Sequence, residues 1–348
     1  MNRSKLLSRV GSMQQLAYVR GITVNEGRAN MLRASEVVNG AMSYLVMEDK
    51  CLDIGTLNYR GENLIFLSKP GLNGRNPFDT NGLEAQRSIM GGLFFTCGFE
   101  NICAPYGKYP MHGRMRTTPA EHVCRDSFWD GDRYILRVSG EMREAELFGE
   151  NMVLRREVRS CYGERVIEIH DEITNEGFRP EPMMLMYHCN FGYPLLDQGT
   201  ELILPSLAIE PRDKISALHT AEWETMPLPT DCAEECVYIH TLASNKSGNT
   251  FAAIVNLALG IGVRIDFNKN DFPWFMQWKS TASGDYVMGL EPSNSCVYGR
   301  RFHEEHNDLP MLAPQKTKKI QWSFTVLDGE ADIRYTLNEC ARLKGDML

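Results

Sequence analysis

Three consecutive segments alternate apolar and polar residues with little chain between them, and this pattern constrains the fold most. They are residues 134–142, 151–160 and 165–174, and turn signals at 149–151 and 162–164 separate them. Alternation with a period of two is typical of strands that bury one face. Parallel neighbours would need crossovers of about a dozen residues, usually helical, and these connections are too short for that. The sequence therefore predicts an antiparallel meander.

The other apolar segments are also short, and no linker divides them into groups. They cover residues 41–47, 64–67, 183–193, 251–256, 262–267, 275–279, 286–291 and 319–327. Helical patterns are confined to residues 82–87 and 337–343. So many strands exceed a simple sandwich of about 100 residues. We expect an all-β fold, a single large antiparallel sandwich with few short helices. It forms one domain over residues 1–348, with an N-terminal extension at 1–34 and a helical tail at 331–348.

Composition excludes several classes of function. The formal charge of −8 and the scattered basic residues argue against a nucleic-acid surface. No apolar stretch approaches the roughly 20 residues of a membrane span, and no signal-peptide core opens the chain. We therefore expect a cytoplasmic protein without nucleic-acid or membrane partners. The ten cysteines predict buried, reduced thiols. Cys232 and Cys236 have a zinc-like spacing but no second pair, and no nucleotide-binding glycine motif occurs, so neither metal nor cofactor is expected.

His112 is the first candidate for chemistry on a small polar molecule. It lies in a Met-His-Gly-Arg stretch after an apolar run, with Glu100 and Asn101 upstream and Arg114 and Arg116 downstream. In a strand, a residue two positions away points the same way, so His112 and Arg114 could together hold an oxyanion or sugar hydroxyls. A turn histidine bonded to backbone is the alternative.

Two further candidates stand at the ends of apolar strands. His188 closes the strand that begins at residue 183, with Asn190 just beyond it, and Glu291 closes the strand over residues 286–291. A desolvated glutamate has a raised pKa and is a natural general base near neutral pH. The alternatives are a hydrogen-bonded core histidine and a glutamate that caps a turn. Asp53, which also ends a strand, is predicted to be structural and to cap a turn.

At these segments the sequence resembles the aldose 1-epimerase (galactose mutarotase-like) superfamily, and within it the DUF4432 branch. The resemblance covers roughly residues 35–328. It is carried by residues 91–101, 111–114, 187–196, 289–294 and 299–300. It implies a β-supersandwich of antiparallel sheets with the site on its concave face.

The resemblance also implies roles for single residues. His188 matches the general acid of the mutarotases, Glu291 their catalytic base, and His112 a second site histidine. Arg114 stands where the family has a glycine, and Arg87 matches an arginine that binds sugar hydroxyls.

Other members of the expected pocket are less directly matched. Asn101 and Asn190 are expected to bind substrate beside the histidines. The family aspartate has no clear counterpart. Asp266 and Asp285 are candidates for it, and Trp278 and Lys279 are expected to fill that part of the pocket. These residues are all present in the sequence at the stated positions.

The leading hypothesis is a cofactor-free epimerase that interconverts the anomers of an aldose, a small-molecule sugar, by general acid–base ring opening. The cationic residues Arg87, Arg114, Arg116 and Lys279 make an anionic sugar a second option. One rival is a metal-dependent lyase, isomerase or hydrolase that uses His112, His188 and Glu291 as ligands. Another is a sugar-binding protein without turnover. The resemblance leaves a homodimer open.

Overall fold

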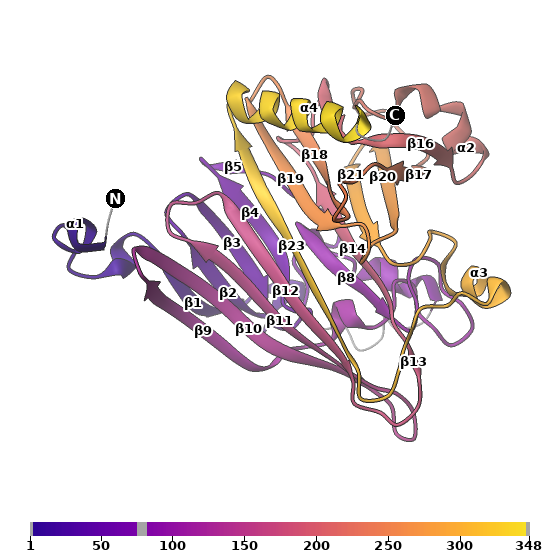
Figure 1. The fold of residues 1–348 in the computed structure, drawn as a ribbon, viewed down its shortest axis with the longest axis horizontal. Helices are drawn as coiled ribbons and strands as arrows, with labels where there is room; N and C mark the ends of the chain where they lie inside the picture. The colour runs from indigo at the N-terminus through magenta and orange to yellow at the C-terminus, as the bar shows by residue number, and fades with distance from the viewer. Residues whose placement is uncertain (1–2, 75–81, 346–348) are drawn as a thin grey trace.

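The predicted meander forms the centre of the molecule. The computed structural model describes residues 3–74 and 82–345 (Figure 1). Strands β9 to β12 run antiparallel in sequence order. Their register aligns Val138 with Val158, Val158 with Ile169, and Ile169 with Trp322 of β23. This row of buried apolar side chains explains why a one-residue slip is excluded, since it would turn the whole row to solvent.

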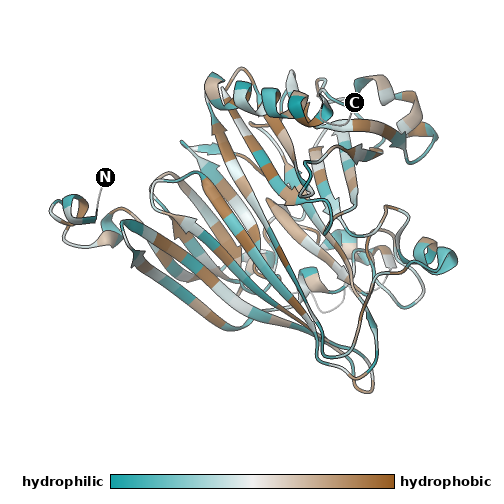
Figure 2. Ribbon diagram, in the orientation of Figure 1, coloured by the Kyte–Doolittle hydropathy of each residue, from teal (hydrophilic) through white to brown (hydrophobic). Residues whose placement is uncertain are grey.

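The meander belongs to an eight-stranded sheet, and Figure 2 shows apolar and polar residues alternating along its strands. Its order is β15-β18-β19-β23-β12-β11-β10-β9. The bounds are β15 (Thr200–Ile203), β18 (Asn249–Asn256), β19 (Ile261–Asn268), β23 (Thr317–Asp328), β12 (Val166–Asn175), β11 (Asn151–Cys161), β10 (Arg133–Ala145) and β9 (Glu121–Asp130).

A six-stranded sheet packs against it and carries the apolar strands expected around residues 183–193, 275–279 and 286–291. Its order is β16-β17-β20-β21-β14-β8. The bounds are β16 (Ser206–Pro211), β17 (Cys236–Leu242), β20 (Trp274–Ala282), β21 (Asp285–Ser293), β14 (Met184–Phe191) and β8 (Phe94–Phe99).

A five-stranded sheet is built from the N-terminal part of the chain. It comprises β1 (Tyr18–Thr23), β2 (Arg33–Val38), β3 (Met42–Met47), β4 (Asp53–Tyr59) and β5 (Glu62–Asn63). The stretch expected as an N-terminal extension contains β1, which pairs with β2 along its whole length, and the first two residues of β2. Two small pairs complete the strands: β6 (Phe66–Leu67) with β7 (Gly91–Gly92), and β13 (Glu181–Pro182) with β22 (Met311–Leu312). Of the loop around residues 72–90, positions 75–81 lie outside the described residues.

The helices lie at the edges of the sheets. They are α1 (Arg3–Leu7), α2 (Lys214–Leu218), α3 (Gly299–His306) and α4 (Glu330–Gly345), with short 3-10 turns at Met13–Gln15, Gly27–Ala29, Gly82–Arg87, Met115–Thr117 and Thr220–Glu222. Figure 1 shows α4 along one end of the eight-stranded sheet, where it covers a small apolar cluster. No helix in the described part of the chain is long and apolar enough to span a membrane. The all-β prediction with few short helices is confirmed.

The main core lies between the eight-stranded sheet and the other two sheets. A buried arginine, Arg156 of β11, ties the three together. It donates to both carboxylate oxygens of Asp171 at 2.8 and 2.7 Å and to Asp53 at 2.6 Å. Asp53 also accepts from Thr96 of β8, and Tyr187 of β14 donates to Asp171. Asp53 is structural, but it binds this arginine and Thr96 rather than only capping a turn.

The expectation of buried thiols holds for most of the cysteines, whereas Cys103 is partly buried and Cys124 and Cys232 are exposed. All ten cysteines are free, and seven of them are buried. Cys232 is exposed whereas Cys236 is buried in β17, so their zinc-like spacing in the sequence does not produce a pair of ligands on one surface.

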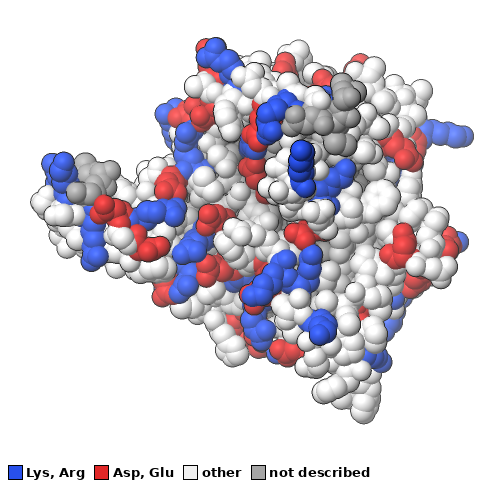
Figure 3. Space-filling model, viewed as in Figure 1, with Lys and Arg blue, Asp and Glu red and all other residues white. Residues whose placement is uncertain are grey.

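Figure 3 shows acidic and basic side chains interspersed over the visible face, without a large patch of either sign. Many of these charges form ion pairs on neighbouring strands, such as Arg137 with Asp126 and Arg155 with Glu141. The face visible in Figure 3 offers no extended basic footprint for a nucleic acid.

Candidate active site

Strand β14 presents consecutive residues to opposite faces of the six-stranded sheet. Tyr187 points into the main core and contacts Asp171. His188 points to the other face, where a second apolar cluster contains Phe95 of β8 and Met186. The imidazole of His188 stacks on the Phe95 ring, with centroids 4.5 Å apart and planes 18° apart. The period-two geometry of the strand therefore separates a structural residue from a site residue.

Glu291 lies beside His188 on the neighbouring strand β21. The pairing of Cys189 with Leu290 sets the register that places His188 next to Glu291. The Nε2 atom of His188 is 3.3 Å from Oε1 of Glu291, and the two residues are only 8% and 4% exposed. In the described part of the chain, neither His188 Nδ1 nor Glu291 Oε1 has a hydrogen-bond partner. Apart from the approach of His188 Nε2 to Glu291 Oε1, the hydrogen-bonding capacity of these two buried atoms is unused by the residues that the structure describes.

Burial shifts the two groups in opposite directions. It lowers the pKa of His188 to about 4, and the Asn190 side chain offsets part of this effect. It raises the pKa of Glu291 to about 8, with Glu235 adding to the rise and Arg212 opposing it. At such a short separation the two groups titrate as a pair. Between these values the pair holds a single proton, so one member can give a proton while the other accepts one.

His112 reaches the same site from a loop. Its ring lies edge-on to Phe95 and to His188, with centroids 5.6 and 5.4 Å away. The Sγ atom of Cys97 lies 3.3 Å from Nδ1 of His112. Burial raises the pKa of this thiol well above its usual value, so the thiol keeps its proton and can donate a hydrogen bond to Nδ1. In that arrangement Nδ1 is the acceptor, and Nε2 carries the single N–H proton of the neutral imidazole.

The conformation of this loop corrects the expectation that His112 stands in a strand. His112 has φ of 60° and Gly113 has φ of 71°. A Cβ on Gly113 would lie 2.2 Å from the carbonyl oxygen of Gly98, so only glycine fits. Because this is a turn, the two-residue spacing to Arg114 does not place both side chains on one face. Burial, then His188 and Arg116, lowers the pKa of His112 well below its usual value.

Trp278 and Lys279 of β20 point to opposite faces, so only one of them lines the site. The Trp278 ring lies edge-on to His188 with centroids 5.4 Å apart, and its Nε1 donates to Glu235 at 2.8 Å. Lys279 faces the main core side and donates to the backbone oxygens of Glu222 and Thr225 at 2.6 and 2.7 Å. The expectation that Lys279 fills the pocket beside Trp278 is therefore corrected by the alternation of the strand.

The two asparagines support the site through the backbone. Asn190 is buried, and its side chain donates to the carbonyl oxygen of His188 at 2.7 Å. Asn101 donates to the carbonyl oxygens of Ala104 and Pro110 at 2.8 and 2.9 Å, which shapes the loop before His112. Asn190 thus holds the backbone at His188, and Asn101 holds the loop that leads to His112.

Two arginines expected in the pocket are engaged elsewhere. Arg87 is largely exposed and pairs with Glu84 in the same 3-10 turn. Arg114 makes an ion pair with Glu100 and donates to the carbonyl oxygen of Lys108.

The candidate aspartates lie outside the site as well. Asp266 pairs with Arg264, and Asp285 pairs with Lys69. Since each carboxylate already has a cationic partner, neither takes the place of the aspartate that the resemblance led us to expect for substrate hydroxyls.

Three site residues were missed from the sequence. Phe95 forms the stacking partner of His188, and the largely apolar run around it gave no sign of which face of the strand it occupies. Arg212 and Glu235 form an ion pair at 3.1 Å next to Trp278, and both influence the pKa of Glu291. They stand in loops with no distinctive sequence pattern, so only the fold brings them to the site.

The residues proposed for the metal-dependent alternative do not form a compact ligand set. Among the described residues, His112, His188 and Glu291 do not bring three donor atoms within 4.8 Å of one another. Nδ1 of His112 is also occupied by the Cys97 thiol. This geometry suits proton transfer between a close pair better than a shared ion.

Comparison with known proteins places the chain in a family. Residues 29–326 match the model of the family described as Domain of unknown function (DUF4432). The chain belongs to the DUF4432 family. A comparison with the curated proteins finds no match.

Solved structures similar to this DUF4432 protein share its fold. A candidate aldose 1-epimerase from Klebsiella pneumoniae has a TM-score of 0.89 at 22% identity, with 99% of this chain and 91% of that chain covered. A galactose mutarotase-like protein from Clostridium acetobutylicum has a TM-score of 0.63 at 11% identity, covering 90% and 99%. The galactose 1-epimerase from Lactobacillus acidophilus has a TM-score of 0.60 at 13% identity, covering 90% and 100%. The fold is therefore that of the galactose mutarotase-like proteins.

Proposed function

We propose that this DUF4432 protein is an aldose 1-epimerase that interconverts the anomers of a free sugar. The observation that carries the proposal is the buried His188–Glu291 pair, with 3.3 Å between Nε2 and Oε1. Ring opening of a cyclic aldose moves a proton from the anomeric hydroxyl and delivers one to the ring oxygen. Both oxygens are bonded to the same carbon, so the acid and the base must be close neighbours. The fold shared with a galactose 1-epimerase adds support.

In the proposed reaction Glu291 takes the proton of the anomeric hydroxyl while His188 Nε2 gives a proton to the ring oxygen. The ring opens to the aldehyde, the bond between C1 and C2 rotates, and the ring closes on the other face with the roles reversed. No redox change occurs, and the pair ends with the same single proton. The pair starts with that proton on Glu291 because burial favours the uncharged form of both groups, and sugar hydroxyls would stabilise its transfer to His188.

Neighbouring side chains would orient the sugar. The partly exposed Trp278 ring offers an apolar platform beside His188, as aromatic side chains do in many ligand sites. The Nε2–H of His112 is held in its donor form by Cys97 and would stabilise negative charge on an oxygen. Since Arg87 and Arg114 are engaged with Glu84 and Glu100, a neutral aldose is the proposed substrate in preference to an anionic one.

The test is anomer exchange measured by saturation-transfer NMR on the full chain. The panel contains neutral, phosphorylated and acidic aldoses, each with and without a chelator. We expect exchange well above the spontaneous rate for at least one neutral aldose, unchanged by the chelator. Exchange at the spontaneous rate for all sugars would refute the epimerase, and activity lost with the chelator would favour the metal-dependent rival. Binding of a sugar without any exchange would indicate a silent binding protein.

The rate of exchange is expected to be nearly constant between about pH 4 and pH 8, because the pKa of His188 is about 4 and that of Glu291 about 8. Below this window His188 gains a second proton and the pair lacks a base. Above it Glu291 loses the proton and the pair lacks an acid. The enzyme-dependent rate, corrected for the buffer-catalysed rate at each pH, should therefore follow a broad bell. A steep change in rate between pH 5.5 and about 7.5 would contradict the assignment.

A further inference from the structure

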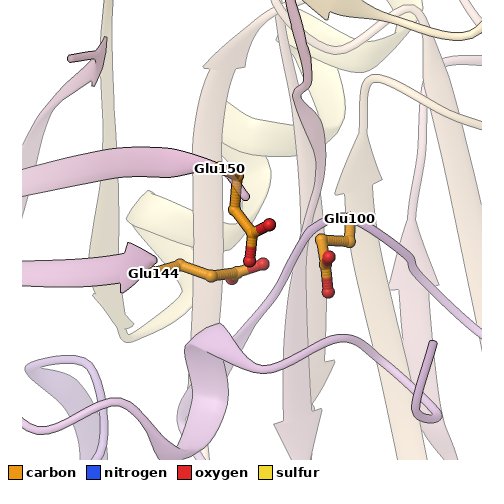
Figure 4. A group of neighbouring side chains, drawn as sticks. All are labelled: Glu100, Glu144 and Glu150. Carbon is orange, nitrogen blue, oxygen red and sulfur yellow. The ribbon is translucent and has the colours of Figure 1, made fainter. Parts of the chain in front are cut away.

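Three glutamates converge at the end of the molecule where the β10–β11 hairpin meets the loop after β8 (Figure 4). Glu144 is the last residue but one of β10, Glu150 precedes β11, and Glu100 follows β8. One carboxylate oxygen of each lies within 4.8 Å of the others. Figure 4 shows the carboxylates of Glu144 and Glu150 next to each other and facing Glu100. Like charges at this distance repel unless a cation or protons neutralise them.

The Glu144 carboxyl is buried, and its hydrogen bonds do not satisfy both of its oxygen atoms. It is only 4% exposed, and its Oε1 has no hydrogen-bond partner in the described part of the chain. Its Oε2 accepts a single long hydrogen bond of 3.3 Å from the Phe99 N–H. Burial raises the pKa of Glu144 to about 8, and the Phe99 N–H and Arg114 offset only part of this rise in pKa. A buried carboxyl oxygen aimed at two other carboxylates is an unfilled acceptor.

The basic residues around the cluster are already engaged. Arg114 pairs with Glu100, Lys108 with Glu146, Arg179 with Glu181, and Arg300 with Glu304. Within residues 3–74 and 82–345, no ion pair reaches Glu144 or Glu150. Arg114 contacts Oε2 of Glu100, which leaves Oε1 of that carboxylate for another partner. The cluster therefore has more negative charge than its protein neighbours neutralise.

A cavity of about 110 Å³ opens beside the three carboxylates; its lining includes Glu100, Glu144 and Glu150, and also Lys108, Arg179 and Arg300, whose charges are paired with other glutamates. One buried water needs only roughly 10–15 Å³, so an ion and several waters fit. Carboxylate oxygens are the ligands of hard cations, and Ca²⁺ binds six to eight oxygens at about 2.3–2.6 Å. Two oxygens on opposite sides of such an ion lie about 4.8 Å apart. The carboxylate oxygens of the cluster lie no farther apart than this.

We propose that Glu100, Glu144 and Glu150 bind a divalent cation of the calcium type, with waters from the cavity completing its shell. The ion would join the exit of β8, the β10–β11 hairpin and the loop that carries His112. Its role would be structural, and the proposal does not depend on the epimerase activity.

The test is Ca²⁺ binding to the full chain after removal of metal ions with a chelator. Calorimetry should show one Ca²⁺ per chain. At a hundredfold excess over the Kd, the midpoint of thermal unfolding should rise by about 4 °C for a chain of this length. Mg²⁺ and Mn²⁺, tested separately, should bind more weakly, since Mg²⁺ requires a smaller and more regular shell.

Variants distinguish Ca²⁺ binding at this site from nonspecific attraction of Ca²⁺ to acidic residues. Glu144→Gln should abolish the Ca²⁺-dependent rise, and Glu150→Gln should weaken binding at least tenfold. The matched control is Glu146→Gln on the same hairpin, because Glu146 is half exposed and pairs with Lys108; it should keep the rise. Circular dichroism without Ca²⁺ checks that each variant is folded. No binding by the wild-type chain, equal binding by Glu144→Gln, or a preference for Mg²⁺ would overturn the proposal.

Discussion

Glu291→Gln is expected to slow enzyme-catalysed anomer exchange by about 10²–10⁴-fold, the usual contribution of a general acid–base group. Glutamine keeps the shape of the protonated glutamate beside His188, but it can neither take the proton of the anomeric hydroxyl nor return it. The measurement is saturation-transfer NMR with the aldose on which the wild-type protein is most active. Sugar binding should remain within a few-fold of wild type.

The same variant makes a separate prediction about stability. The pKa of Glu291 is about 8 in the folded protein, above the ordinary value of 4.5. A group with a raised folded pKa contributes stability that is fully present below the unfolded pKa and is lost as the pH rises through the folded one. Glu291→Gln should therefore be folded at neutral pH and lose less stability than wild type between about pH 5 and pH 9.

A control variant on the same sheet guards against a general effect of charge. Glu210→Gln changes an exposed glutamate at the end of edge strand β16 and should leave the exchange rate unchanged. If Glu291→Gln kept a rate within a few-fold of wild type, Glu291 would not be the catalytic base.

Replacing Arg156 with methionine should lower the free energy of unfolding by about 3–5 kcal/mol, the usual cost of breaking a buried charge pair. Its guanidinium is buried against Asp53 and Asp171, which lie in different sheets. Methionine fills part of the volume but leaves two buried carboxylates without their cation. Urea unfolding followed by tryptophan fluorescence measures the change.

The neighbouring residue supplies a matched control. Arg155 lies on the opposite face of β11, is 46% exposed in its side chain, and pairs with Glu141 and Glu176. Arg155→Met should cost less than about 1 kcal/mol, as exposed ion pairs usually do. Adding Asp53→Asn and Asp171→Asn to Arg156→Met should recover part of the loss. Equal effects of the two arginine variants would contradict the role assigned to Arg156.

Much of the fold could be predicted because strand alternation and turn spacing are local properties. The meander of residues 134–174 is confirmed, and its register follows from which residues are apolar. The strands expected at 251–256, 262–267, 275–279 and 286–291 also form, and they pair as β18–β19 and β20–β21. The β1 strand was not predicted, because its residues form an edge with little burial and carry only a weak pattern.

The site could be predicted in part. His188 and Glu291 stand at strand ends, and the fold brings them to 3.3 Å from each other, which sequence spacing alone could not show. Lys279 was assigned to the pocket although it follows Trp278 directly in a strand, where neighbours face opposite ways. Arg114 was assigned from its distance to His112, but a turn at His112 and Gly113 redirects it to Glu100. Arg156 lies in a strand with several other charged residues, and nothing local distinguishes it from them.

Along β14, residues that face the core alternate with residues that face the site, and this alternation matters for engineering the protein. Tyr187 belongs to the core network and His188 to the site, although they are adjacent in the chain. A library randomised at a partly exposed position on the face of His188, such as Trp278, would explore new substrate preferences while most clones stay foldable. The same library shifted by one residue would mostly yield aggregated protein. Substitutions on the site face of the strand can thus change substrate preference while the core contacts on the opposite face, which stabilise the fold, stay intact.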